Sequence, residues 1–396
     1  MKSEDDSALI GADPGTRPHG IAPVVLGAAI VATTYGMARF ALGLSAPRIV
    51  EDHVASESEL GYASSLSYIT YVAACFISSH WLNRGKWRFS VLAASFFVVV
   101  GCSLVAAATS PTMFIVGVGL AGAAAGFTSG AVAYRLVRTL PQQFEPRGQA
   151  IANAGTGFGV AVATVVLLLT GSWRAVYILA AVLAPVFCIW FCLSRDPHSS
   201  SERGNTDPEE TRGKWSALAI PVILTILMGA GSSVYWTYGR SVADSQAGLS
   251  ENQSLLFWGL IGVAAIGGSF SGDLVKRFGT SWSWSACSIT LAAATAVLPF
   301  SSSSAVSMMS GVLFGLVYTA MCGLTIELGR QAWRSAMGSA TSILFATIAV
   351  GQALGSLLVG ALVGTFGLTA LFAAGSVIVA IGAPLVWAKR ANPART

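Results

Sequence analysis

The chain has 396 residues, of which 54% are hydrophobic and 10% are charged, whereas about 25% of the residues of an ordinary soluble protein are charged. A soluble globule of this composition could not cover its surface with polar side chains, so the sequence predicts a protein that faces lipid. The mean hydropathy of +0.67 agrees with this. A net charge of +5 would suggest nucleic-acid binding in a soluble protein, but here the basic residues follow a topological pattern, described below.

Apolar runs long enough to cross a bilayer fill most of the chain. A membrane-spanning helix needs about 20 apolar residues for a hydrocarbon core of about 30 Å. In chain order the runs cover residues 20–45, 60–79, 89–108, 112–137, 149–170, 173–193, 216–242, 255–270, 282–300, 305–326, 337–363 and 368–387. We therefore predict an all-α integral membrane protein with twelve transmembrane helices, arranged as two six-helix bundles.

The predicted domains follow from these runs. A tail, 1–19, leads into the first bundle, 20–193, and a polar linker, 194–215, leads into the second bundle, 216–388, which ends in a tail, 389–396. The linker has no hydrophobic periodicity and reads as a flexible segment. The first tail is acidic and has no apolar core, so we expect no cleavable signal peptide.

The basic residues predict the orientation. All but four of the 23 lysines and arginines lie in the tails, the linker and the alternate loops on the same side or, for Arg135, at the end of a run that borders such a loop; the exceptions are Arg39, Arg48, Arg174 and Arg240. Positively charged loops stay in the cytoplasm. Both termini are therefore expected to be cytoplasmic, in a multi-pass protein of the cytoplasmic (inner) membrane.

Three short motifs accompany this arrangement. Residues 272–279 (GDLVKRFG) follow the eighth run, residues 147–150 (RGQA) open the fifth, and residues 171–174 (GSWR) precede the sixth. With six runs, a linker and six runs, the whole chain resembles the major facilitator superfamily of secondary transporters. The first helix, with residues 35–40 (YGMARF) and Pro47, is similar to a bacterial branch called YbfB-like.

The resemblance implies alternating access and a charged gate on the cytoplasmic side. Arg84, Asp273 and Arg277 occupy the loops in which the superfamily carries its gating motif. The usual aspartate is replaced by Leu82 in the first copy and by Lys276 in the second, so Asp273 is the candidate substitute. The glycine–proline signature of drug antiporters is absent from the fifth run, so drug export is not specifically indicated.

Acidic residues are scarce at membrane depth. Glu327 lies at the inner end of the tenth run with Arg330 three residues later, a spacing that is ordinarily structural, although a gating or proton role is the alternative. No Asp or Glu falls in the middle of any run, which disfavours proton coupling through a mid-membrane carboxylate. Asn153, Gln352 and Ser232 are polar residues within runs, for which hydrogen bonds between helices are the first interpretation.

Aromatic side chains mark a candidate substrate site. They fall in the first, second and seventh runs, which in the superfamily contribute to the central cavity, and they comprise Tyr35, Tyr68, Tyr71, Tyr235, Trp236 and Tyr238. Amphipathic rings are equally common at the membrane interface. Substrate contact and interfacial anchoring are therefore both open interpretations of this set.

Arg39 is a charge within the first run, about 27 Å from its start at about 1.5 Å per residue, and thus in the outer part of the core. A charge at the helix centre costs about 2.5 to 3.5 kcal/mol. One interpretation is that Arg39 extends to the outer interface or pairs with Glu51 or Asp52. The other rests on an internal echo, since Thr-Tyr-Gly occurs at 34–36 and at 237–239, followed by Arg240. Arg39 and Arg240 would then line a cavity and bind an anion.

The residues 117–122 (GVGLAG) match a dinucleotide-binding fingerprint, but they lie inside an apolar run without a preceding strand. Gly122, Gly126 and Gly130 recur every four residues, so they share a helix face and predict close packing against a neighbouring helix. The six cysteines lie in apolar stretches without histidines beside them, and we expect buried thiols and no metal.

The function we predict is a secondary active or facilitative transporter that moves a small organic solute, with an anion as the specific hypothesis. Efflux of drugs or metabolites, or a transporter-like sensor without flux, are the alternatives. An enzyme would need clustered acids or histidines at membrane depth, and both Gly-Lys pairs precede tryptophan rather than completing a phosphate loop. We expect no cofactor, no nucleic acid, contact with the lipid bilayer and function as a monomer.

Overall fold

The computed structural model describes residues 21–141, 144–194, 215–246, 248–268, 271–333 and 337–388. The predicted tails, 1–19 and 389–396, and nearly all of the predicted linker, 194–215, lie outside these ranges. The first half consists of α1 (Ile21–Val31), η1 (Ala32–Met37), α2 (Ala41–Glu51), α3 (Glu57–Leu82), α4 (Trp87–Ala106), α5 (Pro111–Thr139), α6 (Glu145–Thr170) and α7 (Trp173–Leu193).

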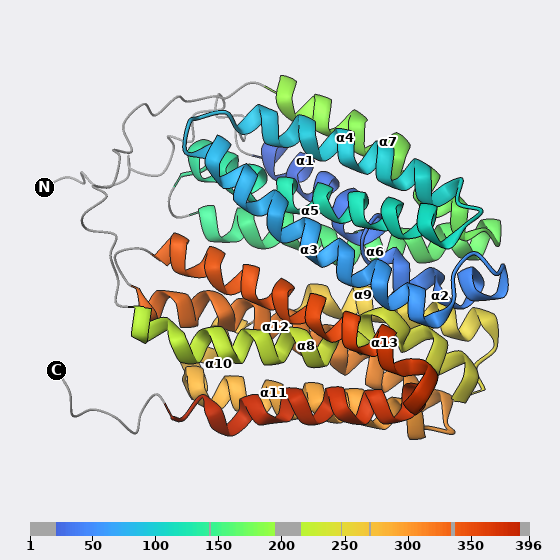
Figure 1. Cartoon of the computed structure of the whole chain (residues 1–396). Coiled ribbons are helices and arrows are strands. Elements are labelled where there is room, and N and C mark those ends of the chain that lie inside the picture. The colour runs from blue at the N-terminus through green and yellow to red at the C-terminus, as the bar shows by residue number, and fades with distance from the viewer. Residues whose placement is uncertain are drawn as a thin grey trace, which may run out of the picture.

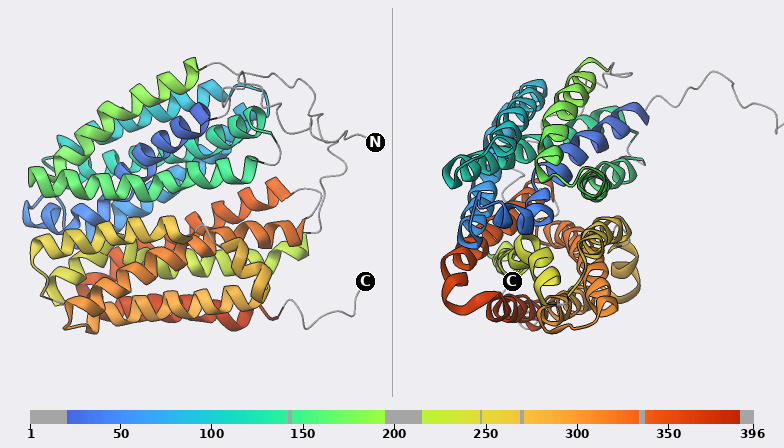
Figure 2. Two further views of the ribbon diagram at one scale, coloured as in Figure 1. Left: turned by 180° about the vertical axis from the view of Figure 1, so that it is seen from behind. Right: turned by 90° about the vertical axis from the view of Figure 1, so that its right-hand side faces the viewer.

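The second half is also helical in the described residues. It consists of α8 (Trp215–Gln246), α9 (Glu251–Gly267), α10 (Ser271–Phe278), α11 (Thr280–Val297), η3 (Leu298–Phe300), α12 (Ser304–Ala332) and α13 (Met337–Leu385). Figure 1 shows α1–α7 as one group of helices and α8–α13 as a second group beside it, and both views in Figure 2 show the same two groups. The two predicted bundles are present.

The number of spans agrees with the prediction. Ten described helices are long and apolar enough to cross a bilayer, and α9 with α10 forms a bent pair that makes an eleventh span. The 49 residues of α13 contain a break at Gly367, whose φ of 72° and ψ of 164° are not helical, so α13 is two spans. Counted this way, the described part of the chain has twelve spans.

Local sequence signals account for several helix ends. Ser56 and Glu59 form a capping box at the start of α3, and Ser250 and Gln253 form one at the start of α9; each box satisfies two backbone N–H groups that have no partner within the helix. At the other end of a helix, Gly171 ends α6 in the left-handed conformation that glycine adopts at little cost.

Glycines determine how closely the spans approach one another. A Cβ added to Gly122 would collide with the backbone of Ser67, one added to Gly126 would collide with Tyr71 O and lie 2.8 Å from Ala74 Cβ, and one added to Gly130 would lie 2.9 Å from Leu82 Cδ1. All three contacts are with α3. The predicted glycine face of α5 is therefore confirmed, and it packs against the helix that carries two of the candidate tyrosines.

The first span is not a continuous α-helix. Between α1 and α2 the backbone widens into the π-helical turn η1, in which Ala38 N donates to Thr33 O and Phe40 N donates to Tyr35 O, both at 2.9 Å and both five residues back. Gly36 in this turn lies against α6, since an added Cβ would be 2.5 Å from Gly159 Cα. Such wide turns are rare and occur often at functional sites. Arg39 follows directly after this one.

The two bundles are joined at one end. We call this end, where Arg48, Glu57 and Glu251 lie, the Arg48 end, and the opposite end, where Trp87, Trp215 and Trp333 lie, the Trp87 end. Arg48 Nε donates to Glu251 Oε1 at 2.8 Å, and Tyr238 Oη donates to Glu57 O at 2.6 Å.

Candidate functional site

Arg39 lies close to the middle of the membrane spans. The first span covers Ile21–Glu51, so Arg39 is three residues beyond its middle residue, Gly36, or about 4.5 Å along a helix of 1.5 Å per residue. This is deeper than the sequence-based position in the outer part of the core. Tyr68 and Tyr71 flank the centre of α3, and Tyr318 is the middle residue of α12.

Aromatic rings surround the guanidinium of Arg39. Its Cζ lies 4.3 Å from the ring centre of Tyr71, 4.5 Å from that of Tyr68 and 5.7 Å from that of Tyr35. Only 8% of the residue is exposed. Each such contact contributes about 0.5 to 2 kcal/mol, which offsets part of the cost of placing a charge at this depth.

The guanidinium of Arg39 makes no hydrogen bond or ion pair with any described residue, and its Nε is completely buried without a partner. The two partners suggested from sequence are turned elsewhere. Asp52 accepts a hydrogen bond from Trp173 Nε1 at 2.8 Å and one from Arg174 Nη1 at 3.0 Å, and Glu51 is exposed. The interpretation that Arg39 pairs with Glu51 or Asp52, or extends to the interface, is therefore wrong.

Tyr35 and Tyr71 of the first bundle are in direct contact. Tyr35 Oη donates to Tyr71 Oη at 3.3 Å, and their rings meet edge to face at 6.0 Å. Tyr71 also packs beside Ala125 of α5 and Ala349 of α13. Because Gly126 allows α5 to approach the backbone of Tyr71 directly, the packing of α5 on α3 positions this ring.

The second bundle completes the cluster. Gln352 Nε2 donates to Tyr318 Oη at 3.0 Å, and both residues are buried. The ring of Tyr318 lies 5.2 Å from that of Trp236, and Trp236 lies 4.4 Å from Phe40, the residue after Arg39. We call Tyr35, Arg39, Tyr68, Tyr71, Tyr318 and Gln352 the arginine cluster. It draws on both bundles at mid-depth.

Trp236 and Phe40 separate the arginine cluster from the Arg48 end. Their contact joins the two bundles, and a Cβ added to Gly43 would collide with Trp236 O and with the ring of Trp258. Further out, Ser64 Oγ shares hydrogen bonds with Thr237 at 3.0 Å and with Ser356 at 3.2 Å. The path from the cluster to the Arg48 end is therefore packed shut.

Arg240 and Tyr238 belong to this closed end, away from Arg39. Arg240 is 1% exposed; its Nε donates to Ser254 Oγ at 3.0 Å, its Nη1 donates to Leu44 O, and Asp244 lies 3.9 Å away. Arg240 thus ties α8 to α9 and to the first bundle. The structure does not bring Arg39 and Arg240 together in one cavity.

The candidate gating residues form local contacts within their own segments. Arg330 Nη2 lies 2.6 Å from Glu327 Oε1, Asp273 lies 4.0 Å from Lys276, Arg277 stacks over Phe278, and Arg84 contacts His80. None of these described contacts reaches the other bundle. A gating role for Arg84, Asp273, Arg277 and Glu327 stays a prediction.

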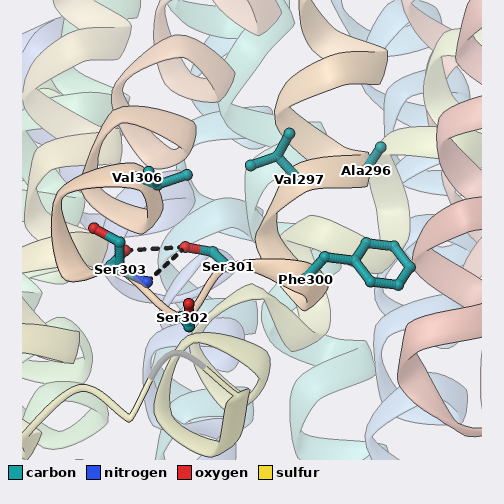
Figure 3. A pocket seen from close by; sticks show the side chains of 7 residues that line it. All are labelled: Ala296, Val297, Phe300, Ser301, Ser302, Ser303 and Val306. Carbon is teal, nitrogen blue, oxygen red and sulfur yellow. Dashed lines mark hydrogen bonds between the residues drawn. The ribbon is translucent and has the colours of Figure 1, made fainter.

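A hollow lies at the Arg48 end of the second bundle, and none of the residues of the arginine cluster lines it (Figure 3). Its seven lining residues are Ala296, Val297, Phe300, Ser301, Ser302, Ser303 and Val306, with a cavity volume of about 460 Å³. Ser301 Oγ donates to Ser303 O at 2.9 Å. The lining carries no charge and only short hydroxyls, so we assign it no role in transport.

Tyr318 and Gln352 are the site residues that the sequence reading missed or set aside. The sequence predicts an interhelical hydrogen bond for Gln352, and the structure confirms it, with Tyr318 of α12 as the partner. The signal for Tyr318 was its position at the centre of the tenth run. A buried aromatic hydroxyl at mid-depth usually has a polar partner. For Tyr318 that partner is Gln352, also in the second bundle.

Comparisons with known proteins agree with this geometry. A family model described as Major Facilitator Superfamily matches residues 28–338. The chain belongs to the Major Facilitator Superfamily. Other members include the purine ribonucleoside efflux pump NepI of Escherichia coli (strain K12), which is 24% identical over 390 residues and 96% of each chain, and the NepI of Shigella dysenteriae serotype 1, which is 24% identical over 402 residues, covering 96% of this chain and 97% of that one.

Solved structures of the superfamily share the fold. A substituted form of the nucleoside transporter NupG superposes with a TM-score of 0.74 at 13% identity, covering 93% of this chain and 99% of that one. A bacterial homologue of the human lysosomal transporter Spinster, inward-facing and unoccupied, superposes with a TM-score of 0.73 at 15% identity, covering 95% and 98%. The chain is a multi-pass membrane transporter of a small organic solute.

Proposed function

We propose that the solute is an organic anion with a flat, unsaturated body, and that the arginine cluster is its binding site. The observation that carries this proposal is Arg39, a guanidinium that is 8% exposed, at the middle of the spans and without a partner among the described residues. Charged residues at membrane depth are retained where they serve a function. We therefore assign the solute as the group that pairs with the guanidinium of Arg39.

The chemistry of the cluster fits such a solute. A guanidinium can give two parallel hydrogen bonds to one carboxylate, which supplies both energy and orientation. The rings of Tyr68 and Tyr71 offer a flat apolar surface beside it. Tyr318 and Gln352 add polar groups from the other bundle. A solute held by both bundles would draw them together, as transport by rocking of the bundles around a midplane site requires.

The orientation is part of the same proposal. Lysines and arginines predict that the Trp87 end faces the cytoplasm. The closed Arg48 end then faces outward. The whole arginine cluster lies within one chain, which supports function as a monomer. The direction of net transport is a separate matter, for which the NepI relatives, named as efflux pumps, suggest export.

A nucleoside is the second candidate, because a purine ribonucleoside efflux pump and a nucleoside transporter both match nearly the whole chain. A base could stack on the tyrosines, while Arg39 donates to a carbonyl oxygen. This reading leaves the charge of Arg39 without a counter-charge. It is therefore second to an anion, and the two make different predictions in one assay.

The test is a counterflow screen with the purified full chain in proteoliposomes that contain a high concentration of unlabelled solute. Labelled benzoate, succinate, alanine, glucose, adenosine and tetraphenylphosphonium serve as probes. We expect benzoate to accumulate, and we expect accumulation to be strongly reduced in Arg39→Gln but kept in Arg138→Gln, an exposed arginine that stacks on Tyr134. Accumulation of adenosine without any anion would replace the proposal by the nucleoside reading.

A further inference from the structure

In the empty carrier, no acidic side chain of the described ranges compensates the charge of Arg39, which is stabilised only in part by the surrounding rings. Acidic side chains in the described ranges lie towards the ends of spans or in loops, where ion pairs join several of them to Arg48, Arg174, Arg240, Lys276 and Arg330. The rings that surround the guanidinium of Arg39 are three phenols, of Tyr35, Tyr68 and Tyr71, and the phenyl ring of Phe40. No described carboxylate lies within ion-pair distance of this guanidinium.

This matters when the carrier changes sides. With one end open, water can reach the outer nitrogens of the guanidinium and stabilise its charge. Between the two open states both ends must close around the midplane, and that water is lost. An arginine does not give up its proton to escape the cost, and a buried charge without a partner is strongly unfavourable. An empty carrier therefore faces a high barrier, whereas a carrier loaded with an anion does not.

We propose that the protein is an obligatory exchanger, which returns across the membrane only with a second anion bound. This inference rests on the function proposed above and specifies its mode. One monoanion moves in each direction per cycle, so no net charge crosses and no coupling ion is required. The absence of a carboxylate at mid-depth among the described residues fits this mode, because nothing else at that depth could take up a proton in place of the solute.

The experiment uses the full chain in proteoliposomes loaded with labelled benzoate and diluted into buffer with or without unlabelled benzoate. We expect efflux to be at least about tenfold faster with benzoate outside. If the whole cost of a centre-placed arginine, about 2.5 to 3.5 kcal/mol, entered the barrier, the ratio would reach about 70 to 370. The matched control, Arg138→Gln, should keep the wild-type ratio.

The decisive variant is Arg39→Gln. Without the charge, the empty site can close, so the ratio of the two efflux rates should fall towards one even if both rates are low. A merely structural arginine would lower both rates and leave the ratio unchanged, and that result would overturn the proposal. If Arg39→Gln does not fold, Arg39→Lys, which keeps a positive charge, should keep a ratio well above one.

The outcomes separate this inference from the one on which it rests. Equal efflux of benzoate into both buffers in the wild-type protein would overturn obligatory exchange, while transport of an anion would stand. No efflux of benzoate into either buffer, together with no anion counterflow, would overturn the proposed solute and the exchange mode at once.

Discussion

Replacing Gly126 by alanine should displace Tyr71 of the arginine cluster, although Gly126 is not itself part of the cluster. The new Cβ would collide with Tyr71 O and lie 2.8 Å from Ala74 Cβ, so α5 must move away from α3. Overpacking of this kind costs about 1 to 3 kcal/mol. Because the added atom presses on the backbone of Tyr71, the ring that stacks on Arg39 at 4.3 Å should shift with it, and solute binding should weaken together with stability.

The matched control is Gly364→Ala, a helical glycine of α13 at which an added Cβ meets nothing within 4 Å. Both substitutions gain the same helix propensity, about 1 kcal/mol. The difference between the stabilities of the two variants therefore reports the effect of the collision alone. The assay is the thermal unfolding midpoint in detergent with and without solute. We expect Gly126→Ala to unfold a few degrees below Gly364→Ala and to lose most of the stabilisation by solute. Equal midpoints and equal stabilisation would refute the packing argument.

Three further predictions concern topology, the linker and pH. In a background without the native cysteines, a cysteine at Ser199 should label only from the cytoplasm and one at Glu57 only from outside; labelling from the same side would contradict the orientation. Trypsin added to inverted vesicles should cut near Arg203 and give two halves of similar size, and resistance under conditions that cleave a control loop would mean that the linker is folded. The hydrogen bond from the Trp173 indole, and to a lesser extent Arg174, lowers the pKa of Asp52 below its ordinary value. The ionised carboxylate therefore stabilises the fold above about pH 4. This stabilisation is lost as the pH falls through the lowered pKa. Asp52→Asn should therefore cost at most about 1 kcal/mol at pH 7, because the pair is half-exposed, and progressively less as the pH falls below about 4; a cost that does not fall between pH 7 and pH 3 would contradict this.

The spans could be predicted from sequence because each apolar run must fill the bilayer by itself. Even the break within α13 was foreseen, since Gly367 lies between the runs 337–363 and 368–387. The wide turn η1 was not foreseen. It contains ordinary residues, and the reason for it is tertiary: Gly36 packs directly against the backbone of Gly159, a contact that no local pattern in the first run reveals.

The arginine cluster was predicted in part. Tyr35, Tyr68, Tyr71 and Arg39 come together as expected, but the echo between the first and seventh helices placed Arg240 with them. The echo failed because the two helices differ in shape and register. Thr34 lies near the middle of a span that widens at η1, whereas Thr237 lies well past the middle of the continuous helix α8. Arg240 is therefore carried to the Arg48 end.

The most direct test of the central claim is equilibrium binding of labelled benzoate to the purified protein and to two variants. A hydrogen-bonded pair with a charged group is worth about 1.5 to 3 kcal/mol, so Arg39→Gln should weaken binding by about 10- to 150-fold. Arg138→Gln should bind like the wild-type protein. Equal affinity in Arg39→Gln and Arg138→Gln, or a wild-type protein that binds none of the anions of the counterflow screen, would contradict the claim that the unpaired arginine at mid-depth receives the solute.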